Sequence, residues 1–227
     1  MDQKMETLYK ILRTETKPAL GCTGPIGACY IAAQAYDAVG GEIRRILVEG
    51  AGPKSDDVAF PGSKMLGVEM AYALGAVCGD PAAGLEVLHT VTPEGELKAR
   101  KTAELVELKN DFSAKAIRYW RKVTIETDKG VGIAICEGAP DGLVYKEGNG
   151  KVLLDKPVDA VNQAGKSPIL DYKIQDFYAL AQICPMERLD FIHSAENMNL
   201  AMADYTLSHQ EVGLGIGRGL WEAEPAT

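Results

Sequence analysis

Histidine and paired cysteine are both scarce in this 227-residue chain. The 3 histidines, His89, His193 and His209, do not have the spacing of metal ligands. The 5 cysteines are odd in number, and none belongs to a CxxC pair. We therefore expect neither a disulfide framework nor a self-contained zinc site.

The chain also lacks long apolar runs and any excess of basic residues. Its formal net charge is −8 and its pI is about 5.0, which disfavours a nucleic-acid or anionic membrane surface as a partner. No run is long enough to span a bilayer, and the first residues contain no apolar signal core. We therefore expect a cytoplasmic protein that binds neither nucleic acid nor membranes.

Common catalytic and nucleotide-binding motifs are missing as well. The sequence contains no GxSxG elbow and no HExxH motif. Residues 213–220 read GLGIGRGL, which superficially resembles a dinucleotide fingerprint. This segment follows a predicted helix and has no βαβ context, so we reject it as a dinucleotide site. Carboxylates are plentiful, but the sequence alone assigns no acid–base pair.

One cysteine stands out because it lies in a turn of small residues. Residues 17–25 read KPALGCTGP and precede a run of small apolar residues that ends at Val39. Thr23 suits a helix N-cap and Pro25 suits the first turn, so Cys22 is expected just ahead of a helix. The helix dipole there favours the thiolate, which attacks electrophiles or binds metal. Three interpretations remain open: a nucleophile, a metal ligand completed by another chain, or a small structural cysteine.

Hydrophobic periodicity predicts an α+β fold, in which helical segments pack with a small antiparallel sheet. Helices are expected over 3–15, 23–39, 63–78, 94–108, 173–183 and 185–210. Short strands are expected over 43–49, 119–127, 130–137, 142–147 and 151–155. Runs of strands followed by helices favour this class over a doubly wound sheet.

Three regions are predicted along the chain, forming one compact unit or half of a larger enzyme. They are a helical part with the cysteine loop over 1–110, a small antiparallel β region over 111–160, and C-terminal helices over 161–227. The loop over 54–63 is rich in glycine, proline and polar residues, so it is the expected second wall of a pocket beside Cys22. The apolar, glycine-rich segment after about Gly213 is expected to be an interface.

The order of these motifs resembles the N-terminal half of the L-cysteine desulfidase family, whose relatives are the iron–sulfur-dependent L-serine dehydratases. The matching segments are ALGCTGP over 19–25, FPGSK over 60–64, MAYALGAVCGD over 70–80, GLEVL over 84–88 and NMNLAMADYTL over 197–207. The resemblance covers nearly the whole chain, and the cysteine motif is its most specific part.

This resemblance implies a lyase subunit that removes the β substituent of L-cysteine or L-serine and gives pyruvate and ammonia. In that family three cysteines hold a [4Fe–4S] cluster, and the remaining iron acts as a Lewis acid. Cys22 matches the metal ligand of the N-terminal half. The substrate-binding residues that the resemblance carries over are Thr23, Lys54, Pro61, Gly62, Ser63 and Asn199.

The chain departs from the family at two points. The usual acidic residue after the threonine is Gly24 here, and the other two cluster cysteines belong to a C-terminal half that this sequence lacks. Cys136 and Cys184 lie in a predicted strand and at a predicted helix end, without the glycine-rich setting of such ligands.

The partners that the resemblance implies are a small amino-acid substrate and a companion chain carrying the remaining cluster ligands, or a second copy of this chain. One alternative is a non-catalytic relative that binds a small amino acid or a partner chain. Another is an enzyme that uses Cys22 as a nucleophile without any cluster.

Overall fold

The computed structural model describes residues 1–51, 67–109, 119–156, 168–209 and 216–223. The chain divides into two compact units, which are described separately below. The α/β unit comprises Pro18–Ser167, and the helical unit comprises Met1–Lys17 together with Pro168–Thr227. The α+β class expected from the sequence is confirmed. The three-part division at 110 and 160 stays a prediction.

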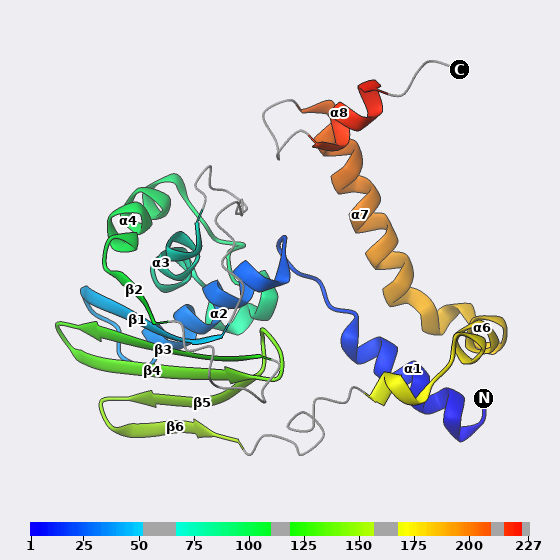
Figure 1. Cartoon of the computed structure of the whole chain (residues 1–227), viewed down its shortest axis with the longest axis horizontal. Coiled ribbons are helices and arrows are strands. Elements are labelled where there is room, and N and C mark those ends of the chain that lie inside the picture. The colour runs from blue at the N-terminus through cyan, green and yellow to red at the C-terminus, as the bar shows by residue number, and fades with distance from the viewer. Residues whose placement is uncertain (52–66, 110–118, 157–167, 210–215, 224–227) are drawn as a thin grey trace. The chain divides into compact units, whose positions relative to one another are not determined.

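A six-stranded sheet forms one layer of the α/β unit, with the strand order β2-β1-β3-β4-β5-β6 (Figure 1). The strands are β1 Ile43–Ala51, β2 Val106–Lys109, β3 Trp120–Thr127, β4 Gly130–Glu137, β5 Leu143–Gly148 and β6 Lys151–Asp155. All neighbours are antiparallel except β1 and β2, which are parallel. The sheet is therefore mixed, whereas the sequence predicts an antiparallel one. The five predicted strands all form.

The helix expected over 94–108 is shorter than predicted. Helix α4 spans Pro93–Ala103, and the chain then enters β2. The sequence VELK of β2 alternates apolar and charged residues, the two-residue period of a strand. These residues pair with the backbone of β1. The pattern that predicted a helix over 94–108 contains no information about this pairing.

Helices α2 (Thr23–Asp37) and α3 (Val68–Cys78) pack on the sheet and form the core with it. Nine of the ten residues of α2 from Ile26 to Ala35, all except Tyr30, are buried, as expected for a helix that is apolar on most sides. Gly75 of α3 lies against the backbone of Cys29, and a Cβ at this position would overlap it. The lack of a Cβ at Gly75 therefore permits the close packing of α2 against α3.

The helical unit pairs the first helix of the chain with the last ones. Its elements are α1 Gln3–Glu15, η2 Pro168–Asp171, α6 Ile174–Ile183, η3 Met186–Leu189, α7 Asp190–Ser208 and α8 Ile216–Ala223. A small core joins Met5 and Leu8 of α1 to Leu180 of α6 and to Cys184. The helix expected over 185–210 instead begins with the 3₁₀ turn η3, for which Pro185 is the N-cap.

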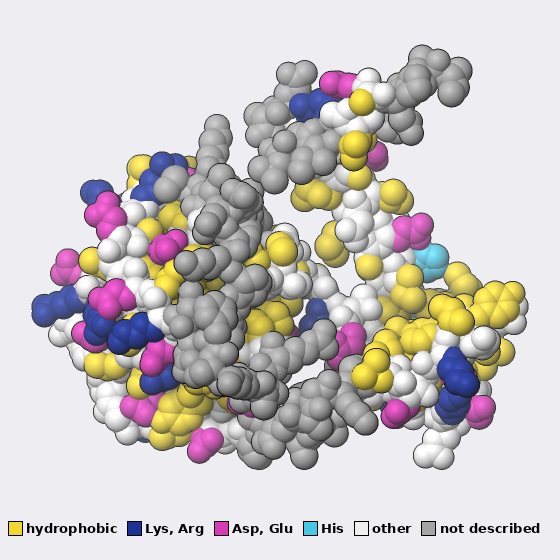
Figure 2. Space-filling model, viewed as in Figure 1, with side chains coloured by type: hydrophobic (Ala, Val, Ile, Leu, Met, Phe, Trp, Pro, Cys, Tyr) yellow, Lys and Arg dark blue, Asp and Glu magenta, His cyan; other side chains and the backbone are white. Residues whose placement is uncertain are grey.

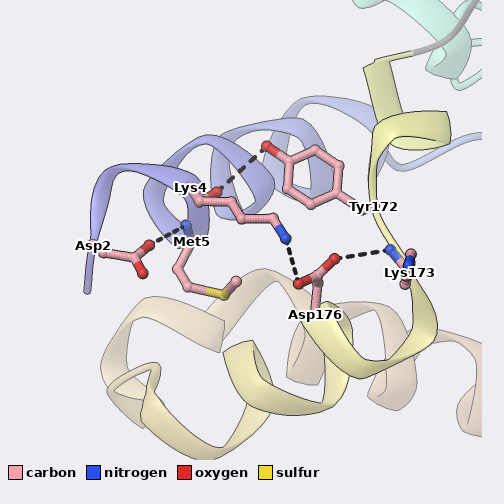
Figure 3. A network of polar contacts seen from close by, with 6 residues as sticks. All are labelled: Asp2, Lys4, Met5, Tyr172, Lys173 and Asp176. Atoms are coloured by element: carbon pink, nitrogen blue, oxygen red, sulfur yellow. Dashed lines mark hydrogen bonds and ion pairs between the residues drawn. The ribbon is translucent and has the colours of Figure 1, made fainter.

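Polar contacts reinforce the pairing of α1 with α6 (Figure 3). The Lys4 ammonium lies 2.6 Å from an Asp176 carboxylate oxygen, and the Lys173 backbone N–H donates to the same carboxylate at 2.9 Å. The Tyr172 hydroxyl donates to the Lys4 carbonyl. These bonds and the small core hold two ends of the chain together within one unit.

Candidate functional site

Cys22 occupies the N-cap of α2, and its side chain is exposed. The turn before it is held by two backbone bonds, from Leu20 N–H to the Leu85 carbonyl at 3.1 Å and from Gly21 N–H to the Ala19 carbonyl at 3.0 Å. Gly21 has φ 91°, a left-handed conformation that glycine adopts without steric cost. The sequence predicts Thr23 as the cap, but Thr23 is the first helical residue.

The other cysteines are less accessible than Cys22. All five lie in the described part of the chain and are free thiols, and Cys29, Cys136 and Cys184 are buried. Burial raises the pKa of Cys136 to about 12 and raises the pKa of Cys29 further still. Cys22 is therefore the thiol that the fold presents to reagents and ligands.

A [4Fe–4S] cluster needs three or four protein ligands, and the described cysteines do not supply them. Cys29 and Cys136 belong to the core of the α/β unit, and Cys184 belongs to the core of the helical unit. Within the described ranges, no group of three or more His, Cys, Asp or Glu side chains could hold a metal ion. A cluster that draws its other ligands from elsewhere stays a prediction.

The predicted substrate-binding residues include two described ones, Thr23 and Asn199, and these belong to different units of the chain. Lys54, Pro61, Gly62 and Ser63 lie outside the described residues. Thr23 begins α2 in the α/β unit, whereas Asn199 lies on α7 in the helical unit. The Asn199 side chain is exposed and donates to the Ala195 carbonyl of its own helix at 2.7 Å. Their assignment as substrate-binding residues stays a prediction.

The helical unit exposes an unusual number of large apolar side chains, which we call its apolar surface. Figure 2 shows hydrophobic side chains gathered over α6 and along α7. Seven of them are more than half exposed on α6, η3 and α7: Ile174, Tyr178, Ile183, Met186, Met198, Leu200 and Met202. Apolar surfaces of this kind are typical of interaction sites.

Helix α7 carries apolar residues on two opposite sides. Met198, Met202 and Tyr205 follow one another at the spacing of one helical face, whereas Leu200 and Leu207 lie on the other side. Among the described side chains of this 19-residue helix, that of Phe191 is buried. A helix that is apolar on several sides is normally buried. No helix in the described ranges is long and apolar enough to cross a membrane.

A shallow hollow in the α/β unit does not involve the predicted site. It lies beside the end of α2, has a volume of 510 Å³, and includes Tyr36, Lys98 and Lys101 in its lining. Of the described site residues, neither Cys22 nor Thr23 nor Asn199 belongs to its lining.

Known proteins of similar sequence have names that state no activity. A protein of Clostridium botulinum (strain Langeland / NCTC 10281 / Type F) is 30% identical over 96% of this chain and 52% of its own length. A Caldanaerobacter subterraneus protein is 31% identical, and one from Shewanella baltica (strain OS155 / ATCC BAA-1091) is 32% identical, with coverage of 97% and 96% of this chain. The chain resembles UPF0597 proteins. It spans about half the length of these relatives.

No family model matches the chain, and no solved structure matches it.

These relatives correct the family and the function inferred from the motifs. They are named UPF0597 proteins, and no L-cysteine desulfidase or L-serine dehydratase name appears among them. The resemblance to that family is therefore wrong as an assignment. The iron–sulfur lyase function and its non-catalytic alternative, which depended on that resemblance, have no support in the relatives.

The apolar surface of the helical unit was missed by the sequence analysis, which expects an interface only after about Gly213. Residues 213–215 lie outside the described residues, and the structure describes α8 beyond them. A signal for the larger surface is present in NMNLAMADYTL, where apolar residues occur on two sides of one predicted helix. This pattern shows that the helix needs covering on both sides, but the sequence does not show what covers it.

Proposed function

We propose that this chain is an assembly subunit whose helical unit binds a second polypeptide along α6 and α7. The observation that carries the proposal is the exposure of Met198, Leu200, Met202 and Tyr205 on α7, which ranges from 48% to 60%. Burying a side chain of this size contributes about 1.5–3 kcal/mol relative to leaving it exposed. The apolar surface thus offers ample free energy for association.

The relatives contain a second half that this chain does not match. We propose that the second polypeptide corresponds to that half. The match covers 52% of the Clostridium botulinum relative, so nearly as many residues again belong to that protein. In a full-length relative, the equivalent of the helical unit shares a chain with that other half. We therefore propose that the counterpart of this unmatched half, and not a second copy of this chain, covers the apolar surface.

We place this assembly in the cytoplasm. Five free thiols without a CxxC pair suit a reducing compartment, in which disulfides are rare.

The test measures the mass of the particles by analytical ultracentrifugation. The chain is analysed alone and mixed with the unmatched half of the Clostridium botulinum relative. We expect a one-to-one complex with that half. Met202→Glu places a charge in the apolar surface and should weaken the complex by about 30-fold or more, the effect of losing a central contact residue. Asn197→Glu adds the same charge to a polar position of α7 and should leave the complex intact.

Other outcomes overturn the proposal in distinct ways. Self-association that Met202→Glu abolishes would assign the apolar surface to a second copy of this chain. A monomer that binds no added half would remove the assembly role altogether.

A further inference from the structure

A charged residue occupies a core position of β3. The inward-facing residues of this strand alternate along the chain, and Val123 and Ile125 are fully buried. Arg121 takes the next inward position and is only 8% exposed. Arginine is almost never buried to this degree unless its charge is paired, because desolvation of the guanidinium is costly.

The described neighbours of Arg121 satisfy only part of its guanidinium. Arg121 lies near enough to Tyr72 to influence the pKa of its hydroxyl, and the central carbon of the guanidinium lies 5.1 Å from the centre of the Tyr119 ring. None of the ion pairs between described residues includes Arg121. Its Nη1 atom is buried and has no hydrogen-bond partner among the residues that the structure describes.

A second buried donor lies beside Arg121. The Tyr119 hydroxyl is also buried, and no described residue forms a hydrogen bond with it. Tyr119 directly precedes β3 and is two positions from Arg121. Residues two positions apart along an extended chain project toward the same face of the sheet. Burial raises the pKa of Tyr119 well above its ordinary value of 10.0, so the hydroxyl keeps its proton and remains a donor.

We propose that Arg121 and Tyr119 form a binding site for a small oxyanion, a carboxylate or phosphate group. Two buried donors and a guanidinium that forms no ion pair with a described residue call for a negatively charged acceptor rather than for water alone. A guanidinium binds such groups with two parallel N–H bonds, and one of its nitrogens is already unused. Asp141 lies close enough to raise the pKa of Tyr119 and of Cys136, so it contributes opposing negative charge and favours a singly charged group.

The site lies in the α/β unit and does not depend on the proposed assembly through the helical unit. Its ligand is small, because the two donors are buried within the core face of the sheet.

Isothermal titration calorimetry on the full chain tests the site with sodium acetate and inorganic phosphate, at constant ionic strength set with chloride. We expect saturable binding of one of these probes. Arg121→Met should abolish it, and Tyr119→Phe should weaken it about tenfold, as expected for one lost bond to a charged group. Arg45→Met removes a partly exposed arginine that pairs with Glu107 and Glu126 on the same sheet, and should bind like the parent protein.

Each result decides the proposal. Binding of acetate without phosphate assigns a carboxylate ligand, and the reverse assigns a phosphate group. Failure of both probes to bind saturably, or equal binding by Arg121→Met, overturns the site. Tyr119→Phe and Arg121→Lys keep the test valid if Arg121→Met does not fold. The Met202→Glu protein should bind the probe normally, which separates this site from the assembly.

Discussion

Arg188 of η3 donates hydrogen bonds to both carboxylate oxygens of Glu6 on α1, at 2.7 and 2.9 Å, although 182 positions separate the two residues. The same guanidinium lies 4.0 Å from the centre of the Tyr9 ring. A forked pair of this geometry is more specific than a single lysine contact. It fixes how the first helix of the chain pairs with the last ones.

This pair predicts a loss of stability of the helical unit in acid. The Arg188 hydrogen bonds lower the pKa of Glu6 below its ordinary value of 4.5. Because the folded pKa is the lower one, the contribution is present above pH 4.5 and is lost as the pH falls through the folded value. Glu6→Gln should therefore flatten the acid side of the melting temperature plotted against pH.

The control is Asp190→Asn, which removes a longer, exposed pair with Arg13 at 3.5 Å. Such pairs contribute little, so this variant should follow the parent curve. An unchanged acid side in Glu6→Gln would show that the pair does not stabilise the unit.

Much of the fold follows from local pattern, as the strands β3 to β6 illustrate. Their apolar alternation and the turns at 128–130 and 148–150 give the sequence enough local information to predict each strand. The strand β2 was not predicted, because four residues after a helix carry little periodicity of their own. Its partner β1 lies 60 positions earlier in register, from Ile46 to Val106, and such pairing is not a local property.

The site residues were harder to predict for a different reason. Cys22 could be placed at a helix N-terminus because its neighbours include capping and turn residues. Arg121 lies in the segment WRKVTIET, where it is followed by a second charged residue, Lys122. The sequence alone does not show which of the two side chains faces solvent. Only the three-dimensional structure shows that this arginine faces inward and that its Nη1 has no partner among the described residues.

A second prediction concerns the close approach of α2 and α3. Gly75→Ala adds a methyl group that would overlap the Cys29 carbonyl, so the two helices must separate. Overpacking of this kind costs about 1–3 kcal/mol of unfolding free energy. Gly24→Ala is the matched control, since no atom lies within 4 Å of its added methyl group. It should be neutral or stabilise by up to about 1 kcal/mol, because alanine favours the helix.

Urea denaturation followed by circular dichroism measures both variants. Equal midpoints for Gly75→Ala and Gly24→Ala would show that the two helices are not tightly packed at Gly75.

A third prediction orders the thiols by reactivity. Iodoacetamide attacks the thiolate, so exposure and pKa together determine the rate. Cys22 is exposed, whereas burial protects Cys29 and raises the pKa of Cys136 to about 12. Peptide mass spectrometry of the native protein should therefore find Cys22 labelled first, and Cys22→Ser should lack this fast phase. Labelling of Cys136 at a comparable rate would contradict the buried position of β4.

A fourth prediction concerns Asn149, which adopts φ 52° in the turn between β5 and β6. Its side chain accepts from the Val131 N–H at 2.8 Å and donates to the Lys129 carbonyl at 3.1 Å, so it links this turn to the β3–β4 turn. Asn149→Ala loses both bonds and replaces asparagine, which tolerates the left-handed conformation, with alanine, which adopts it less readily. These effects together should cost about 2–3 kcal/mol of unfolding free energy.

Two further substitutions at this position separate the causes. Asn149→Gly loses the same bonds but adopts the backbone conformation freely, so it should cost about 1 kcal/mol less than Asn149→Ala. Asn149→Asp keeps the bond from the Val131 N–H and loses only the donor to the Lys129 carbonyl. Equal stability of the alanine and glycine variants in urea would mean that backbone strain contributes nothing here. In that case the whole cost would come from the two side-chain bonds, and the aspartate variant should recover a large part of it.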